Sequence, residues 1–158
     1  MIGDLFKKDI EDSLLIHGEA WNGEGIQTQA ILFENTTDHW EKIKTSFIES
    51  CERKPVAVRA WAYIERPGIN TYPRWHTHGE NRDYGHCFQC GVMYLDRFKH
   101  GTMFKFGNME IIGDPTPFVW HMFSPNTIHR PPDWDIHSTE TRYVISVEAF
   151  DSIDESLI

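Results

Sequence analysis

The sequence predicts an α+β protein in which strands predominate, and three observations support this prediction. Helical patterns occur in the N-terminal third of the chain. After Pro55, short runs rich in β-branched and aromatic residues follow one another without helical patterns between them. Glycine and proline separate these runs, as is typical of turns between strands. Many short consecutive strands favour an antiparallel sandwich or jelly roll over a parallel sheet.

The length of 158 residues suits one domain with one core, so residues 1–158 are expected to fold together. Residues 1–54 would supply a supporting arm, strand and helix, and residues 55–150 the jelly-roll core. No internal repeat or low-complexity segment marks a boundary. The predicted strands of the core are residues 56–64, 88–95, 102–106, 110–112, 117–123 and 142–150.

The N-terminal elements are predicted from the spacing of apolar residues. Residues 4–16 are compatible with a short helix or an arm, and residues 26–33 alternate as in a strand. A helix should begin near Asp38, because residues 35–38 offer capping side chains and an acid follows Asp38 at the capping-box spacing. This helix should pack on a sheet and end before Pro55. Its predicted apolar face contains Trp40, Ile43, Phe47 and Cys51.

Composition excludes several classes of function. The formal net charge of -9 argues against a nucleic-acid surface, which usually carries a clustered basic stripe. No apolar run approaches the roughly 18 residues of a membrane span, and the N-terminus lacks a basic-then-apolar leader. Three cysteines are an odd number and too few for a secreted disulfide framework. A cytoplasmic protein without nucleic-acid or membrane partners is therefore expected.

The segment Trp75-His76-Thr77-His78-Gly79-Glu80 carries metal-binding side chains at strand spacing. Residues i and i+2 share a face of a strand, so His76 with His78, or His78 with Glu80, can reach one ion together. His129 follows a strand-like run and a turn, and it would supply the third ligand. Two ligand sets remain open: His78, Glu80 and His129, or His76, His78 and His129. Imidazole and carboxylate ligands with open positions describe a non-haem iron site for oxygen chemistry.

Arg142 opens the last predicted strand, and its side chain should enter the barrel. A buried guanidinium requires a carboxylate partner. Glu140 and Glu148 are the acids near it in the chain, and either would give an internal salt bridge. The carboxylate of a ligand is the other candidate partner.

Several segments in a fixed order carry a family resemblance: residues 63–68, the run Trp75-His76-Thr77-His78, and residues 91–95, 101–104 and 123–129. Through them, residues 63–150 resemble the 2-oxoglutarate and iron(II)-dependent oxygenases, especially the prolyl-4-hydroxylase-like members. The resemblance implies a double-stranded β-helix, a cupin-like jelly roll with N-terminal helices packed on its major sheet. It departs from the family at His78, where an aspartate or glutamate is usual.

The resemblance also implies site residues and cofactors. Aligned on His76, it favours His76, His78 and His129 as iron ligands, with Glu80 as the alternative. Arg142 matches the basic residue that binds the far carboxylate of 2-oxoglutarate, and Tyr94 is a candidate hydrogen-bond donor to that cosubstrate. Fe(II) and 2-oxoglutarate would support hydroxylation of a small-molecule or peptidyl substrate.

Three other interpretations remain open from the sequence. A three-histidine cupin-type iron dioxygenase would work without 2-oxoglutarate, and a jelly-roll binding or structural module would not be an enzyme. Cys87 and Cys90, with His86 or His78, could hold a structural zinc ion, although Cys90 is better explained as a small buried strand residue. Association into a homo-oligomer would cover an exposed sheet edge.

Overall fold

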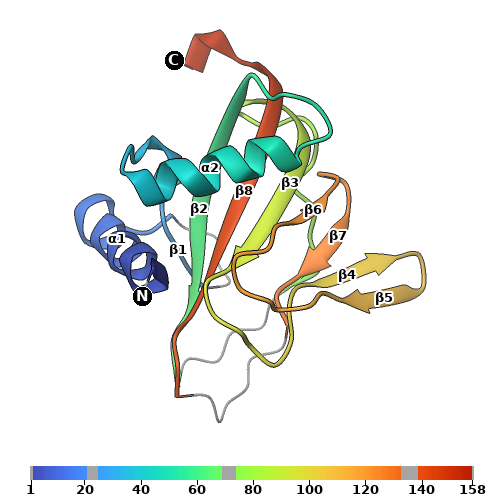
Figure 1. Cartoon of the computed structure of the whole chain (residues 1–158). Coiled ribbons are helices and arrows are strands. Elements are labelled where there is room, and N and C mark those ends of the chain that lie inside the picture. Colours follow the sequence, from blue (N-terminus) through green and yellow to red (C-terminus); the bar gives the residue numbers. More distant parts are fainter. Residues whose placement is uncertain (1, 21–24, 69–73, 133–138, 158) are drawn as a thin grey trace.

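Two antiparallel sheets face each other, and both helices pack on the outer face of the larger sheet (Figure 1). The structure is a computed structural model, and it describes residues 2–20, 25–68, 74–132 and 139–157. The larger sheet has the strand order β1-β2-β8-β3-β6 and the smaller sheet β5-β4-β7. This arrangement confirms the predicted mainly β, α+β architecture with helices on the major sheet.

The elements follow the predicted order of helices first and strands afterwards. Their bounds are α1 Ile2–His17, β1 Ile26–Gln27, a 3-10 turn Leu32–Glu34, α2 Asp38–Ser50, β2 Ala57–Glu65, β3 Gly85–Tyr94, β4 Met103–Phe106, β5 Met109–Ile112, β6 His121–Phe123, β7 Ile128–Arg130, β8 Arg142–Ile153 and a 3-10 turn Glu155–Leu157. The predicted core strands all occur, and β7 is an addition too short to be recognised from a pattern.

Two predicted strands are shorter than expected. Of residues 26–33, only Ile26 and Gln27 form a strand, because the chain then turns and buries Leu32 and Phe33 in the core beneath the helices. Of residues 117–123, only the last three pair with β3. Phe118 has a positive φ of 61° and donates its backbone N–H to the carbonyl of Tyr94, which ends the extended conformation there.

Side-chain alternation on the three central strands divides the core into two clusters. Ala60, Ala62 and Ile64 of β2 face the helices, together with Ile145, Val147 and Ala149 of β8. On this side α2 inserts Trp40, Ile43 and Phe47, as the helical spacing predicts. The opposite side of the same strands carries Cys90, Val92, Tyr94 and Val144, which face the smaller sheet. On this inner side lies a cavity lined by Val92, Tyr94 and Val144 of the larger sheet and by His129 of the smaller one.

Gly91 of β3 marks the closest approach between α2 and the sheet. A Cβ atom at this position would lie 2.8 Å from a ring carbon of Phe47 and 3.0 Å from the sulfur of Met122. We expect Gly91→Ala to lower the free energy of unfolding by about 1–3 kcal/mol, as is usual for overpacking a core. Urea unfolding measures this. Gly3→Ala is the control, because its Cβ would have no neighbour nearer than 3.6 Å and stability should not fall.

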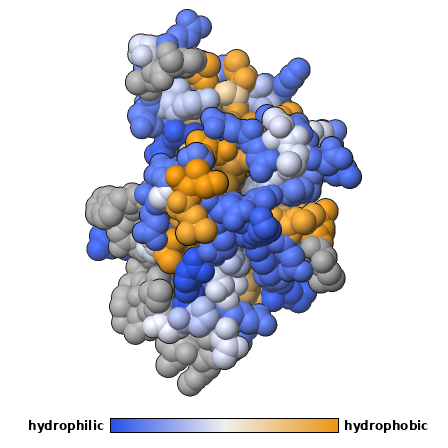
Figure 2. All heavy atoms as spheres, turned by 90° about the vertical axis from the view of Figure 1, so that its left-hand side faces the viewer, coloured by the Kyte–Doolittle hydropathy of each residue, from blue (hydrophilic) through white to orange (hydrophobic). Residues whose placement is uncertain are grey.

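The surface is mainly hydrophilic but includes apolar patches. Figure 2 shows such patches on the side where α1 lies, and Leu15 and Ile16 of α1 are well exposed. All four residues of β5, at the edge of the smaller sheet, are also exposed. Homo-oligomer formation over such an edge stays a prediction. Among the described helices, none is both long and apolar enough to span a bilayer.

Candidate metal centre

Backbone pairing brings His76 and His129 together, although they are far apart in the sequence. The N–H of each donates to the carbonyl of the other at 3.0 Å, as in an antiparallel strand pair. Two residues further on, the N–H of His78 donates to the carbonyl of Pro125. His129 itself lies on β7, paired with Phe104 of β4. Residues 76–79 thus extend the smaller sheet and present both histidines beside His129.

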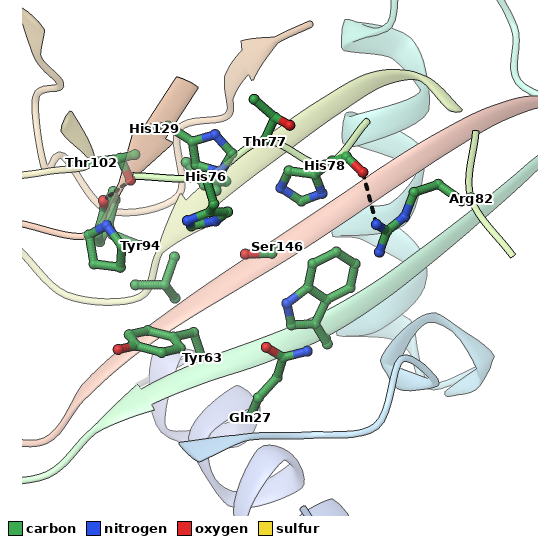
Figure 3. Close-up of a pocket in the computed structure, with 14 residues that line it drawn as sticks. Gln27, Tyr63, His76, Thr77, His78, Arg82, Tyr94, Thr102, His129 and Ser146 are labelled. Atoms are coloured by element: carbon green, nitrogen blue, oxygen red, sulfur yellow. Dashed lines mark hydrogen bonds between the residues drawn. The ribbon is translucent and has the colours of Figure 1, made fainter. Parts of the chain in front are cut away.

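The three imidazoles converge on one point (Figure 3). One ligand atom from each of His76, His78 and His129 lies within 4.8 Å of the other two. The rings of His78 and His129 stack with centroids 5.0 Å apart, and the ring of His76 lies 4.4 Å from that of His129. A single ion can therefore be reached by all three side chains.

The tautomers are set by the hydrogen bond that each ring makes through Nδ1. The Nδ1 atoms of His76 and His129 lie 2.8 and 2.9 Å from the carbonyl oxygens of Arg74 and Thr127. A carbonyl can only accept, so both Nδ1 atoms carry the proton. The Nδ1 of His78 lies 3.0 Å from a carboxylate oxygen of Glu148. Each Nε2 is consequently the lone-pair nitrogen, which is the arrangement that orients histidine as a metal ligand.

Burial keeps His129 neutral. Loss of solvent, with smaller contributions from the neighbouring histidines, lowers the pKa of His129 to about 3 despite the hydrogen bond to Thr127. The side chain is 4% exposed. A neutral imidazole is the form that binds a metal, so binding at His129 need not displace a proton.

Glu80, the alternative ligand predicted from the sequence, lies outside this group. Its side chain is exposed, and one carboxylate oxygen accepts a hydrogen bond of 2.9 Å from the amide of Asn126. The strand spacing on which that alternative depended fails here, because Gly79 has a positive φ of 75° and interrupts the extended conformation. The geometry therefore favours the three-histidine set.

Glu148 lies behind His78 at the candidate site, a position that the sequence did not reveal. It is fully buried on β8, with His78 and the guanidinium groups of Arg59 and Arg82 around it. Burial acts to raise the pKa of Glu148, but the hydrogen bond from His78 and the charges of the two arginines outweigh it, so its pKa is lowered. The ionised carboxylate orients His78 from behind, as such carboxylates commonly do for metal-binding histidines.

We expect Glu148→Gln to weaken metal binding by about 10- to 100-fold, the usual effect of losing a carboxylate that orients a ligand. The amide retains the shape of the side chain but lacks the charge that favours the donating His78 tautomer. Calorimetric titration with Mn(II) measures the change in Kd. Asp151→Asn is the control, since Asp151 similarly accepts from His86 but lies on the exposed surface. An equal loss in both variants would contradict the assigned role.

Arg142 enters the barrel as predicted, and its cross-strand partner is an acid that the sequence did not suggest. Arg142 of β8 lies directly opposite Glu65 of β2 and forms a buried ion pair with it. Glu148 is six residues further along the same strand, roughly 20 Å away at the rise of extended chain, and so cannot reach. Burial raises the pKa of Glu65, and Arg142 partly offsets that effect. The predicted salt bridge exists, with a cross-strand acid as the partner.

Tyr94, the predicted donor to a cosubstrate, lines a cavity of about 430 Å³ together with the three histidines. Its hydroxyl hydrogen-bonds to that of Thr102, and burial raises its pKa. Tyr63 and Ser146 line the same cavity (Figure 3). Arg142 lies close enough to Tyr94 for its charge to affect the phenol, but it is not among the described residues of the lining.

The cysteines of the zinc interpretation lie close together, and one ligand atom each from His78, Cys90 and Glu148 lies within 4.8 Å of the other two. The sulfur atoms of Cys87 and Cys90 lie 3.7 Å apart and both residues are buried. His86 is occupied by Asp151 instead. The hydrogen bond to Cys87, burial and the nearby Glu148 all raise the pKa of Cys90. A protonated, buried thiol fits the interpretation of Cys90 as a small strand residue.

The two sheets form a double-stranded β-helix, the fold found in prolyl hydroxylases and other 2-oxoglutarate-dependent oxygenases. A prolyl-4-hydroxylase from Pseudomonas putida superposes with a TM-score of 0.65 and 10% identity, covering 94% of this chain and 86% of the other. The predicted fold is thereby confirmed.

Two further structures share this fold. The carbocyclase SnoK from nogalamycin biosynthesis, a non-haem α-ketoglutarate-dependent enzyme, gives a TM-score of 0.69 at 10% identity, over 94% of this chain and 74% of that one. A collagen prolyl hydroxylase from Paramecium Bursaria Chlorella virus-1, in a 2-oxoglutarate complex, gives 0.60 at 15% identity, over 94% and 89%. No family model matches the sequence, and neither does any curated protein.

Proposed function

We propose that this protein is a non-haem iron(II) oxygenase that uses 2-oxoglutarate to hydroxylate a small-molecule or peptidyl substrate. One observation carries the proposal: three histidines in a jelly-roll cavity each engage an acceptor through Nδ1 and leave Nε2 for a metal. The fold shared with 2-oxoglutarate-dependent enzymes supports the choice of iron and of this cosubstrate. Iron with 2-oxoglutarate would supply the oxidising chemistry.

The residues of the chain would hold and shield the reacting groups. His76, His78 and His129 would be the iron ligands, and Glu148 would fix the ring of His78. The usual third ligand of a non-haem iron site is a carboxylate, and here histidine takes its place. Glu148 would supply a negative charge directly behind His78, but it would not itself bind the metal. The apolar walls, including Val92 and Val144, would keep bulk water from the metal.

The cosubstrate would lie toward Tyr94 and Thr102, whose hydroxyl groups can donate to a carboxylate. Arg142 lies behind Tyr94, and its buried Nε has no hydrogen-bond partner among the described residues. We propose that the far carboxylate of 2-oxoglutarate pairs with this guanidinium, in exchange for part of the contact with Glu65. The names of the similar structures range from a collagen prolyl hydroxylase to a carbocyclase of nogalamycin biosynthesis, so they leave the substrate class open.

A second candidate is a three-histidine iron dioxygenase that does not use 2-oxoglutarate. It is favoured by the ion pair between Arg142 and Glu65, which already neutralises the guanidinium that would bind the cosubstrate. Such an enzyme would need Arg142 for stability and not for ligand binding.

Anaerobic titration separates the two candidates. Iron(II) is added to the metal-free protein and 2-oxoglutarate follows, while the weak visible charge-transfer band of the chelate is recorded. The proposal predicts a band that disappears in His129→Ala. Iron binding without such a band would support the second candidate, and failure to bind iron would exclude both.

A further inference from the structure

The charges around the cavity differ from those of the whole protein. The chain carries a formal net charge of -9. Among the described residues that line the cavity, however, none bears a carboxylate, and Arg82 is the one arginine or lysine. A low-dielectric cavity with one guanidinium and no acid favours an anion. The ligand of this cavity should therefore carry a negative charge.

Arg82 is held firmly at the cavity wall. Its Nη1 donates a hydrogen bond of 2.8 Å to the carbonyl of His78, which Figure 3 shows as a dashed line. Its Nε lies 3.0 Å from a carboxylate oxygen of Glu148, an ion-pair contact without hydrogen-bond geometry. The side chain retains 34% exposure, and it contributes to the cavity lining. These two contacts fix the guanidinium in place before any ligand arrives, which reduces the entropic cost of binding.

Charge balance indicates what Arg82 can accept. Glu148 is surrounded by two guanidinium groups, and Arg59 already donates to its other carboxylate oxygen at 2.9 Å. The group Glu148, Arg59 and Arg82 thus carries one excess positive charge. Asp83, the other acid near Arg59, is 3.6 Å away and 89% exposed, so solvent screens its charge. A single excess charge matches a carboxylate better than a doubly charged phosphate.

The wall next to this charge is aromatic. Trp61 of β2 lines the cavity, and its ring lies 5.6 Å from that of His78, the residue whose carbonyl Arg82 binds. Tyr63, two residues further along β2, lines the same cavity. An aromatic surface beside a guanidinium suits a molecule with a planar apolar body and an acidic end.

The proposed position for 2-oxoglutarate is distinct. Arg142 and Glu148 lie six residues apart on the inward-facing side of β8, which places their backbones roughly 20 Å apart at the rise of extended chain. A five-carbon dicarboxylate held at Arg142 cannot also reach the guanidinium beside Glu148. Arg82 consequently remains available to a second anion.

We propose that Arg82 and Trp61 form the recognition site for the substrate, and that the substrate is a carboxylate with an aromatic or similarly planar apolar body. Calling this acid the substrate rests on the proposed oxygenase function, whereas its binding at Arg82 does not. The guanidinium would hold the carboxylate, and Trp61 would pack against the body near the histidines. The carbon to be oxidised would then lie on that body, between the acid and the metal centre.

The test uses metal-free protein without 2-oxoglutarate, so that its outcome is independent of iron chemistry. The probes are benzoate, phenylacetate, 3-phenylpropionate and indole-3-acetate, each paired with its neutral carboxamide, and calorimetry gives Kd. We expect at least one acid to bind more tightly than its amide. Arg82→Gln should raise the Kd of that acid by about tenfold or more, the effect of one charge-assisted hydrogen bond. The Kd of the amide should not change.

Arg59→Gln is the matched control. It removes the other guanidinium from Glu148, but Arg59 is not among the described residues of the cavity lining. Arg59→Gln removes the excess charge but keeps the guanidinium that lines the cavity, so the acid should lose clearly less affinity in this variant than in Arg82→Gln, and Arg82→Lys should recover part of the affinity. Equal weakening in the Arg59 and Arg82 variants, or no preference for any acid over its amide, would overturn the proposal. Displacement of the acid by 2-oxoglutarate through Arg82 would also overturn it, because the site would then serve the cosubstrate.

Discussion

Replacing His129 with alanine should weaken the binding of Mn(II) or Fe(II) by more than about 100-fold, since even a residue that only orients a ligand contributes 10- to 100-fold. His129 is the most buried of the three histidines, and its Nε2 is directed toward the other two rings. Isothermal titration calorimetry under anaerobic conditions measures the affinity.

Two further variants show whether the loss is specific. Glu80→Gln should leave metal affinity unchanged, because the carboxylate of Glu80 contacts Asn126 and lies outside the histidine group. His86→Gln should also leave it unchanged, because the ring of His86 pairs with Asp151 at the surface. A strong loss in Glu80→Gln would restore the set of two histidines and one carboxylate. That result would require residues 79 and 80 to rearrange when metal binds.

The architecture was predictable because the helices and strands follow from local patterns of apolar and turn-forming residues. The apolar face of α2 follows helical spacing, and the turns between strands are marked by glycine and proline. Two predicted strands were too long because the backbone conformation of a single residue can end a strand. The positive φ of Phe118 is one such case, and nothing in the residue type announces it.

The candidate site was predictable in part, for a related reason. His76 and His78 lie close together in the chain, so their shared role could be inferred, and His129 was inferred from the strand-like run and turn before it. The family resemblance then gave Arg142 a role in binding the cosubstrate. Pairs across strands could not be inferred, because neither segment on its own determines the register of β2 against β8. Glu65 opposite Arg142 and Arg59 opposite Glu148 both follow from that register. The acid that pairs with Arg142 was therefore missed, and Glu148, one of the two acids considered for that role, lies behind His78.

Exchanging Glu65 for glutamine should lower the free energy of unfolding by about 3–5 kcal/mol, the range observed when one partner of a buried ion pair is removed. The cause is the guanidinium of Arg142, which is 4% exposed and would lose its counter-charge. Urea unfolding monitored by tryptophan fluorescence measures the change. The double variant Glu65→Gln/Arg142→Gln is the control and should be less destabilised than the single one, because it leaves no uncompensated charge.

The single variant Glu65→Gln also reports whether Arg142 binds 2-oxoglutarate. If the far carboxylate of the cosubstrate pairs with Arg142, it replaces the charge that Glu65→Gln removes. Added 2-oxoglutarate should then raise the Tm of Glu65→Gln more than that of the wild type, because ligand binding stabilises the folded state according to its affinity. Equal or absent stabilisation in the two proteins would assign Arg142 to structure alone. In that case the competition between Glu65 and the cosubstrate would not exist, and the three-histidine dioxygenase without 2-oxoglutarate would be the better account of the cavity.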